Sequence, residues 1–213
     1  MSKKYIDKWA LWVESLHKDV EKLLVSREIY KRYLEIVKDN PSIQSPADFH
    51  YWVRENYVVS VITAIRRQLD VRKDVISLMR LLLEIHNHSE ALSRDWYKTT
   101  HQYNWADVDF SEIGGDGYFF DKKIAMEDII QLKLLGESIQ EYSHKFIAHK
   151  SKKGMKKIPS FKEVDDFIEK LEEITKKYIL LFTASGYTNL LPVWQYDWDA
   201  IFKKKWIKDD NQS

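Results

Sequence analysis

Two histidines stand five residues apart in "EYSHKFIAHKSKKGMKK", the stretch from Glu141 to Lys157. With a side-chain pKa near 6.5, a histidine can take a proton from a ribose 2′-hydroxyl or give one to a leaving oxygen. These two proton transfers are the ones that RNA cleavage without a metal requires. His144 and His149 are therefore candidates for general acid–base catalysis.

The same stretch also supplies cations. A phosphorane that forms during RNA cleavage carries negative charge, and arginine is the residue best suited to stabilise it. Lys145, between the two histidines, is a weaker substitute. The lysines downstream could hold a phosphate backbone by charge alone. They are Lys150, Lys152, Lys153, Lys156 and Lys157.

A purely structural interpretation of these residues stands beside the chemical one. A histidine near a helix C-terminus often only stabilises the helix dipole, and a lysine-rich turn is usually a solvated surface. On a straight α-helix, Lys145 and His149 share a face with Tyr142, whereas His144 points away. The two imidazoles would then need a kink, a second chain or a substrate to meet. Composition and spacing alone favour the structural interpretation.

The elements that must position these residues are helices. Apolar residues at spacings of three and four predict helices over about 5–39, 48–69, 74–99, 124–150 and 160–186, the first with a possible break near Ser26. Ser45 is the expected N-cap of the second helix, with Pro46 at its first position. Ser160 and Glu163 form a capping box for the fifth.

Two segments lie outside these helices. Residues 101–122 show no helical period and contain three of the chain's 6 glycines, so we expect a long loop there. The aromatic tail should pack back onto the bundle. We therefore expect one all-α domain over 1–213, with its core at about 5–186 and its tail at 187–213.

Composition restricts the classes of function. The chain has 213 residues, a net charge of +1 and no cysteine, so disulfides, thiolate metal sites and cysteine nucleophiles are excluded. "HNH" at 86–88 places its two histidines on different helix faces, which does not suit a metal pair. We expect neither a metal nor another cofactor. No apolar run is long enough to span a membrane, so a cytoplasmic location is expected.

Three segments of the chain together resemble a known superfamily. "SHKFIAHK", following an amphipathic helix, resembles the signature of the HEPN superfamily (higher eukaryotes and prokaryotes nucleotide-binding). "AIRRQLDVRKDVISLMRLLLEI" at 64–85 and "YDWDAIFKKKWI" at 196–207 are similar to segments of its AbiU-like branch of bacterial abortive-infection proteins. The resemblance implies a HEPN-like helical bundle.

The resemblance also implies roles for individual residues. His149 matches the motif histidine, and His144 matches the polar position of the motif. The motif arginine falls on Ser143, which departs from the pattern because serine supplies no cation. Arginines of the second segment could replace it, or could simply form ion pairs around Asp70 where two helices meet. They are Arg66, Arg67, Arg72 and Arg80.

The resemblance finally implies a function and partners. Many HEPN proteins are metal-independent ribonucleases, so we expect an endoribonuclease of bacterial defence or toxin type. The alternative is a degenerate HEPN protein that binds RNA, an antitoxin or another protein without cleavage. A homodimer is expected, in which His144 of one chain could approach His149 of the other. A plain helical protein with an accidental resemblance is the third interpretation.

Overall fold

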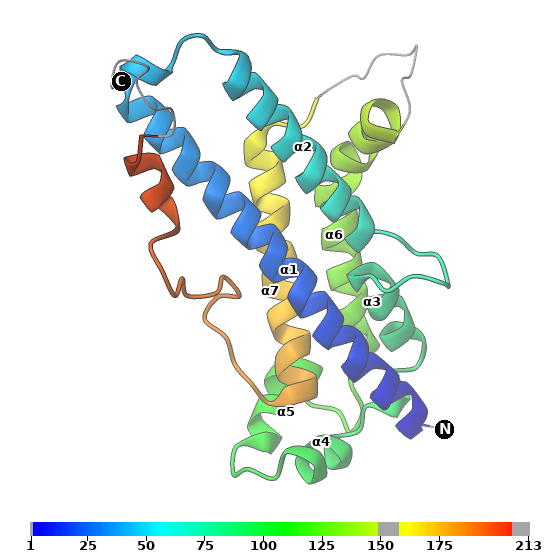
Figure 1. Ribbon diagram of the computed structural model, residues 1–213. Coiled ribbons are helices and arrows are strands. Elements are labelled where there is room, and N and C mark those ends of the chain that lie inside the picture. Colours follow the sequence, from blue (N-terminus) through cyan, green and yellow to red (C-terminus); the bar gives the residue numbers. More distant parts are fainter. Residues whose placement is uncertain (1, 149–157, 206–213) are drawn as a thin grey trace.

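The protein is an all-helical bundle (Figure 1), as the sequence predicts. The computed structural model describes residues 2–148 and 158–205, and this part of the chain contains no β-strand. The α-helices are α1 (Ser2–Asp39), α2 (Asp48–Gln68), α3 (Leu78–Asn87), α4 (Arg94–His101), α5 (Ala106–Gly114), α6 (Lys122–Tyr142) and α7 (Phe161–Thr183). The shorter helical segments are η1 (Pro41–Ile43), η2 (Ser89–Ala91), η3 (Ser143–Ala148) and η4 (Trp198–Lys203).

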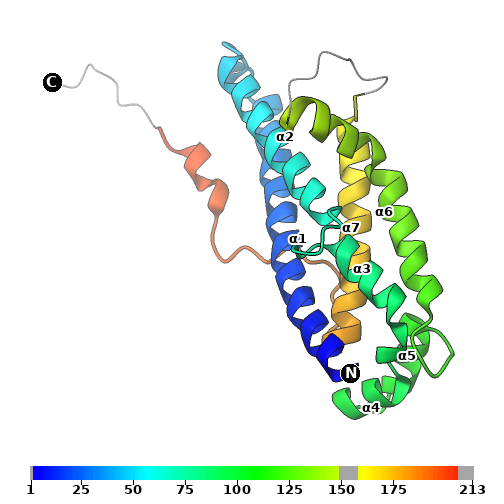
Figure 2. The same ribbon diagram turned by 90° about the vertical axis from the view of Figure 1, so that its right-hand side faces the viewer.

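The long helices share one hydrophobic core. α1 packs on α7 and α2, and α6 packs on α3 and α7, while α4 and α5 lie together at one end of the bundle (Figure 2). α1 has 38 residues, which corresponds to a length of about 57 Å at the α-helical rise. It is not broken near Ser26, whose hydroxyl donates to the carbonyl of Lys22 (2.8 Å) within the helix. No helix in the described part of the chain has both the length and the apolar character to cross a membrane.

A glycine lets α2 lie close against α6. A Cβ added at Gly136 of α6 would lie 2.6 Å from a methyl group of Leu69 at the end of α2, and 3.1 Å from the ring of Phe167 on α7. A larger residue would therefore separate these helices. The close contact keeps α2 beside the end of α6 and beside η3, where the histidine motif begins.

Two predicted helix boundaries are wrong. α2 begins at Asp48 with Ala47 as its N-cap, so Pro46 lies in the preceding turn and Ser45 is not the cap. The predicted helix over 74–99 is two helices, because the Ser77 hydroxyl accepts from an amide of α3 and the Ser93 hydroxyl accepts from an amide of α4. Each serine competes for backbone hydrogen bonds and starts a new helix.

The expected loop over 101–122 contains a helix. Ala106, Phe110 and Ile113 are buried on one face of α5. Their spacings of four and three follow the helical period, but the nearby glycines obscure it in the sequence. Arg94 then holds the remaining loop, because its guanidinium donates to the carbonyls of Asp107 (2.9 Å) and Gly115 (3.0 Å). The segment is therefore more ordered than the sequence predicts.

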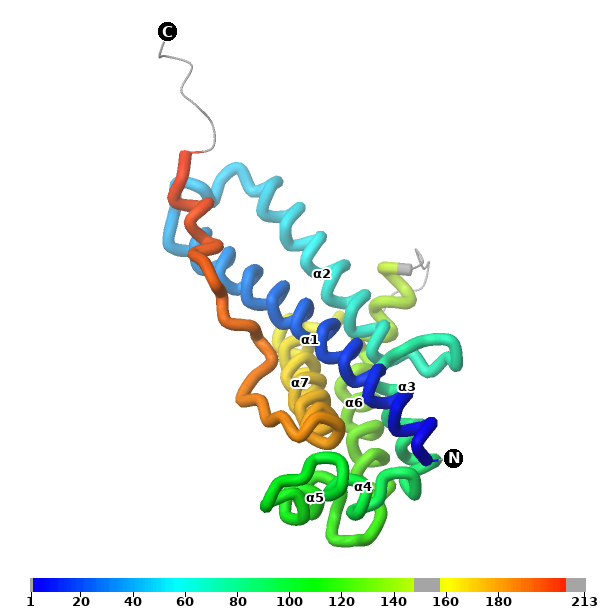
Figure 3. Tube along the Cα trace, turned by 60° about the horizontal axis from the view of Figure 1, so that its bottom comes forward, coloured from blue at the N-terminus to red at the C-terminus, as the bar shows by residue number. Residues whose placement is uncertain are grey.

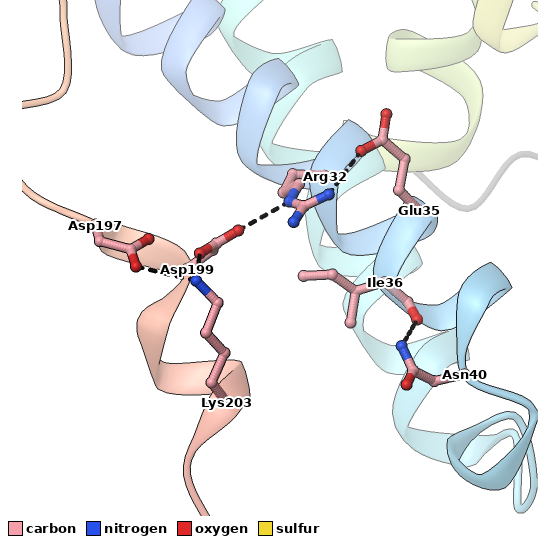
Figure 4. Close-up of polar contacts among 7 residues, drawn as sticks. All are labelled: Arg32, Glu35, Ile36, Asn40, Asp197, Asp199 and Lys203. Atoms are coloured by element: carbon pink, nitrogen blue, oxygen red, sulfur yellow. Dashed lines mark hydrogen bonds and ion pairs between the residues drawn. The ribbon is translucent and has the colours of Figure 1, made fainter.

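The C-terminal tail returns to the bundle, as predicted, and its η4 segment reaches α1 (Figure 3). The buried Leu190 donates its amide hydrogen to Glu172 of α7 (2.6 Å). Farther along, Arg32 of α1 donates to Asp199 of η4 (2.9 Å), as Figure 4 shows. Leu190 itself belongs to the hydrophobic core, whereas Tyr196 farther along the tail remains exposed.

Candidate functional site

α6 does not continue as an α-helix through the histidine motif. Its last residue is Tyr142, and η3 winds as a π-helix from Ser143 to Ala148. A π-helix bonds each amide to the carbonyl five residues back, and its short turns often occur at functional sites. The prediction of an α-helix to about residue 150 is therefore wrong over 143–148. The α-helical period therefore does not give the face of the helix on which Lys145 lies.

Ser143, at the position of the motif arginine, is buried. Its side chain is 1% exposed, and its hydroxyl has no hydrogen-bond partner among the described residues. The backbone amide of Ser143 donates to the carbonyls of Ile139 and Gln140, so the residue is fixed at the end of α6. Neither its chemistry nor its position suits contact with a phosphate in this conformation.

The next two residues of η3 differ in their surroundings. His144 is exposed to solvent. The ammonium group of Lys145 lies 2.6 Å from the carboxylate of Glu141, one turn earlier. The carboxylate of Glu141 therefore competes with a phosphate for Lys145. Of the four expected catalytic positions, His144 is therefore the one that the structure describes as open to solvent.

The other expected residues of the motif lie outside the described residues. They are His149, Lys150, Lys152, Lys153, Lys156 and Lys157.

Three of the four candidate arginines are engaged with carboxylates. Arg67 lies 3.1 Å from Asp19, and Arg80 lies 3.0 Å from Glu84. Arg72 contacts both oxygens of Asp70, and its hydrogen bonds lower the pKa of that carboxyl. Arg66 is exposed on the last turn of α2. The structure does not bring these arginines together into one cluster with the histidine motif.

A pocket of about 470 Å³ lies between α2, the end of α6, η3 and the start of α7. Its walls are mostly apolar, and one arginine and one glutamate line it. The lining residues are Arg54, Glu55, Tyr57, Val58, Val59, Val61, Ile62, Tyr142, Ile147, Ile158, Pro159, Phe161 and Val164. Because Ile147 belongs to η3, the motif turn itself forms part of the wall.

Sequence reasoning missed Arg54 and Tyr57 of this pocket. Arg54 stands one turn before Val58 and both line the pocket, but nothing in the local sequence indicates that this face of α2 borders η3. The guanidinium of Arg54 lies 5.1 Å from the ring of Tyr51, a cation–π distance. Burial raises the pKa of Tyr57 to about 12, so its hydroxyl stays protonated near neutral pH.

No group of three histidine, aspartate or glutamate side chains in the described part of the chain is arranged to hold a metal ion. Among the described residues, His86 and His88 of the "HNH" sequence belong to no such group. His86 instead lies 3.0 Å from the carbonyl of Lys122, and His88 stacks on Tyr5.

Comparison with known protein families identifies a match over most of the chain. The family model HEPN_AbiU2, described as AbiU2, matches residues 6–201. The matched range includes α2 to α7, η3 and the pocket, and it ends within η4. No curated protein and no solved structure matches the chain.

Proposed function

Because this chain belongs to the AbiU2 family of HEPN proteins, which are of the abortive-infection type, we propose that it is a metal-independent endoribonuclease of bacterial defence. The observation that carries the proposal is the family match over 6–201, which includes the whole histidine motif. The exposed position of His144 on a π-helical turn beside a pocket supports it further.

In this mechanism the nucleophile comes from the RNA itself. His149 removes the proton of a 2′-hydroxyl, and that oxygen attacks the adjacent phosphorus. The bond from phosphorus to the 5′-oxygen of the next nucleotide then breaks, and that oxygen receives a proton from an acid of the site. The products are a 2′,3′-cyclic phosphate and a 5′-hydroxyl. His144 is the polar partner that orients the phosphate or supplies the second proton.

The cation of the site comes from α2 in this proposal. Ser143 is buried and Lys145 is paired with Glu141, so the described part of η3 offers little positive charge to a phosphorane. Arg54 lines the pocket that η3 also lines, and a guanidinium suits the oxygens of a phosphorane. Arg66, exposed near the end of α2, is the second candidate.

A homodimer belongs to the same proposal. Two chains would each contribute a motif turn, so that His144 of one chain approaches His149 of the other. Such an arrangement would remove the need for both imidazoles to meet within one helix.

Binding without cleavage is the second candidate function. It is favoured by the burial of Ser143 at the arginine position and by the carboxylate partners of Arg67, Arg72 and Arg80. In that case the protein binds RNA, an antitoxin or another protein partner through the same face.

Incubation of purified protein with single-stranded RNA in EDTA tests the proposal. We expect the wild type to release fragments with 2′,3′-cyclic phosphate ends, and to leave the same RNA intact where the 2′-hydroxyls are replaced by hydrogen. His149→Ala should lose at least about 100-fold in rate, the lower end of what general acid–base catalysis contributes. His86→Ala is the control, because His86 lies on α3 and outside the pocket. RNA that the folded wild type binds but does not cleave would favour the second candidate.

A further inference from the structure

The pocket beside η3 has the size of a small-ligand site. At about 470 Å³, it falls within the usual range for pockets that hold one small molecule. Four separate segments build it, namely α2, the end of α6, η3 and the residues around the start of α7. A pocket of this kind fits a compact flat group better than it fits an extended helix of a partner protein.

Aromatic rings beside the pocket lie nearly parallel. The Tyr30 and Tyr57 rings stack with centroids 3.8 Å apart and an angle of 11° between planes. The Phe161 ring lies 6.4 Å from the Tyr57 ring at 22°, and 5.9 Å from the Tyr30 ring at 26°. Tyr57 and Phe161 both line the pocket, so an incoming flat ring could extend the stack.

Polar groups of opposite charge line the same pocket. Arg54 supplies a guanidinium, which suits a phosphate or the face of a base. The Glu55 carboxylate only accepts hydrogen bonds, so it favours a base edge that carries N–H donors. A nucleotide has all three complementary parts, since it joins a flat ring, an edge with donors and a phosphate.

We infer that this pocket binds one unpaired base of single-stranded RNA, stacked beside Tyr57 and Phe161, with the adjoining phosphate near Arg54. The inference rests on the proposed function for the class of ligand. It adds a site that the histidine motif does not contain, and it explains how the RNA is positioned. Because η3 forms part of the wall, a base in the pocket brings its own ribose and phosphate toward the motif turn.

A fluorescent RNA that cannot be cleaved tests the inference. The probe is a single-stranded decamer with 2′-O-methyl groups and one 2-aminopurine, whose fluorescence falls when it stacks on an aromatic ring. Phe161→Ala removes a ring that is 48% exposed, and Phe119→Ala is the matched control, because Phe119 is 47% exposed in the segment before α6 and does not line the pocket. Circular dichroism checks that both variants are folded.

We expect the wild type and Phe119→Ala to quench the probe and to bind it with similar affinity. Phe161→Ala should weaken binding by about tenfold, within the range for the loss of one stacked base. An abasic nucleotide in place of 2-aminopurine should weaken binding to the wild type by a similar factor. In Phe161→Ala, the same replacement should cause little further loss of affinity. Arg54→Ala should reduce the salt dependence of binding while quenching remains.

Other outcomes overturn the inference in distinguishable ways. If Phe161→Ala binds and quenches like the wild type, RNA binding stands but the base site does not. If Phe161→Ala converts a dimer to a monomer without changing RNA affinity per chain, a second copy of the chain occupies the pocket instead. If the wild type neither binds nor cleaves RNA, the proposed function and the base site both fail.

Discussion

At Ser143 this chain departs from the motif of its superfamily, which has an arginine at that position. An arginine there would have to place its guanidinium where the structure places a side chain that is 1% exposed. Burying an unpaired charge costs far more than burying a hydroxyl. In the proposed mechanism the cation therefore has to come from another element, and Arg54 of α2, which lines the pocket, is the residue proposed for it.

Substitution of Ser143 by alanine should stabilise the protein. The buried hydroxyl has no hydrogen-bond partner among the described residues, and such a group costs about 1–3 kcal/mol. We expect Ser143→Ala to raise the free energy of unfolding in urea by about 1 kcal/mol.

Ser77 is the matched control, because it is also buried but accepts a hydrogen bond from the amide of Arg80 (3.0 Å). Ser77→Ala should lower the free energy of unfolding by about 1–2 kcal/mol. Equal losses in both variants would mean that the Ser143 hydroxyl has a partner.

Removing the charge of Glu141 should strengthen RNA binding. Lys145 would then lose the carboxylate of Glu141 at 2.6 Å, which is one interaction that opposes its contact with a phosphate. For Glu141→Gln we expect about threefold tighter binding of single-stranded RNA at low salt, and a plot of log K against log salt that is steeper by about 0.7. Glu137→Gln, one turn earlier on α6 and also exposed, is the control. Equal effects in both variants would indicate a general charge effect rather than release of Lys145.

At the scale of elements, the long helices were predictable and the breaks between them were not. The apolar stripes of α1, α2, α6 and α7 repeat over many turns, and the capping box of Ser160 and Glu163 is present as expected. α5 was missed because nine residues carry few repeats of the period and glycines follow them. The break before α4 depends on the capping role of Ser93, which the apolar pattern does not reveal.

The candidate site was predictable only in part. "SHKFIAHK" marks the motif in the sequence, but the π-helical turn depends on how η3 packs against α2. The contact between α2 and η3 joins residues about 85 positions apart, and a local pattern carries no signal for it. Arg54 and Phe161 were therefore missed as members of one pocket. The sequence does not reveal the partner of Arg67, which forms an ion pair with Asp19 of another helix, α1.

The link between η4 and α1 should depend on Arg32 (Figure 4). Its guanidinium contacts Asp199 at 2.9 Å and Glu35 at 3.1 Å. Arg32→Ala should speed hydrogen exchange of the backbone amides of η4 by about two- to fivefold, as expected for loss of a surface ion pair. Glu35→Gln is the control, since it removes the other partner of Arg32 and leaves Asp199 in place. Unchanged exchange in Arg32→Ala would show that other contacts hold η4.

The same link should weaken in acid. A hydrogen bond shared with the Asp197 carboxyl, together with hydrogen bonds from Arg32 and Lys203, lowers the pKa of Asp199 to about 2, below the value of about 3.9 for an unfolded chain. The ionised carboxylate therefore stabilises the docked tail above about pH 4, and this stabilisation is lost as the pH falls toward 2. Exchange of the η4 amides should rise over that interval in the wild type. In Asp199→Asn the tail should be looser at pH 7, and the acid-dependent change should be smaller.

At the scale of the whole molecule, α2 exposes an aromatic surface that suits contact with a second copy. Phe49 and Trp52 stack with centroids 6.0 Å apart, and Trp52 is 60% exposed. Such groups are enriched at protein interfaces. We expect a homodimer at micromolar concentration in sedimentation analysis, and a monomer for Trp52→Glu. Trp105→Glu is the control, because Trp105 is 70% exposed at the start of α5. A wild type that is monomeric at all concentrations tested would remove the basis for a site shared between chains.

The most direct test of the central claim is chemical rescue of His149→Ala by imidazole, measured as the rate of RNA cleavage in EDTA. If His149 transfers the proton, the variant should be inactive alone. Added imidazole should restore part of the rate, in proportion to the fraction of imidazole in the required protonation state. His149→Ala that cleaves as fast as the wild type without imidazole would contradict the account. A folded wild type that cleaves no RNA would contradict it as well.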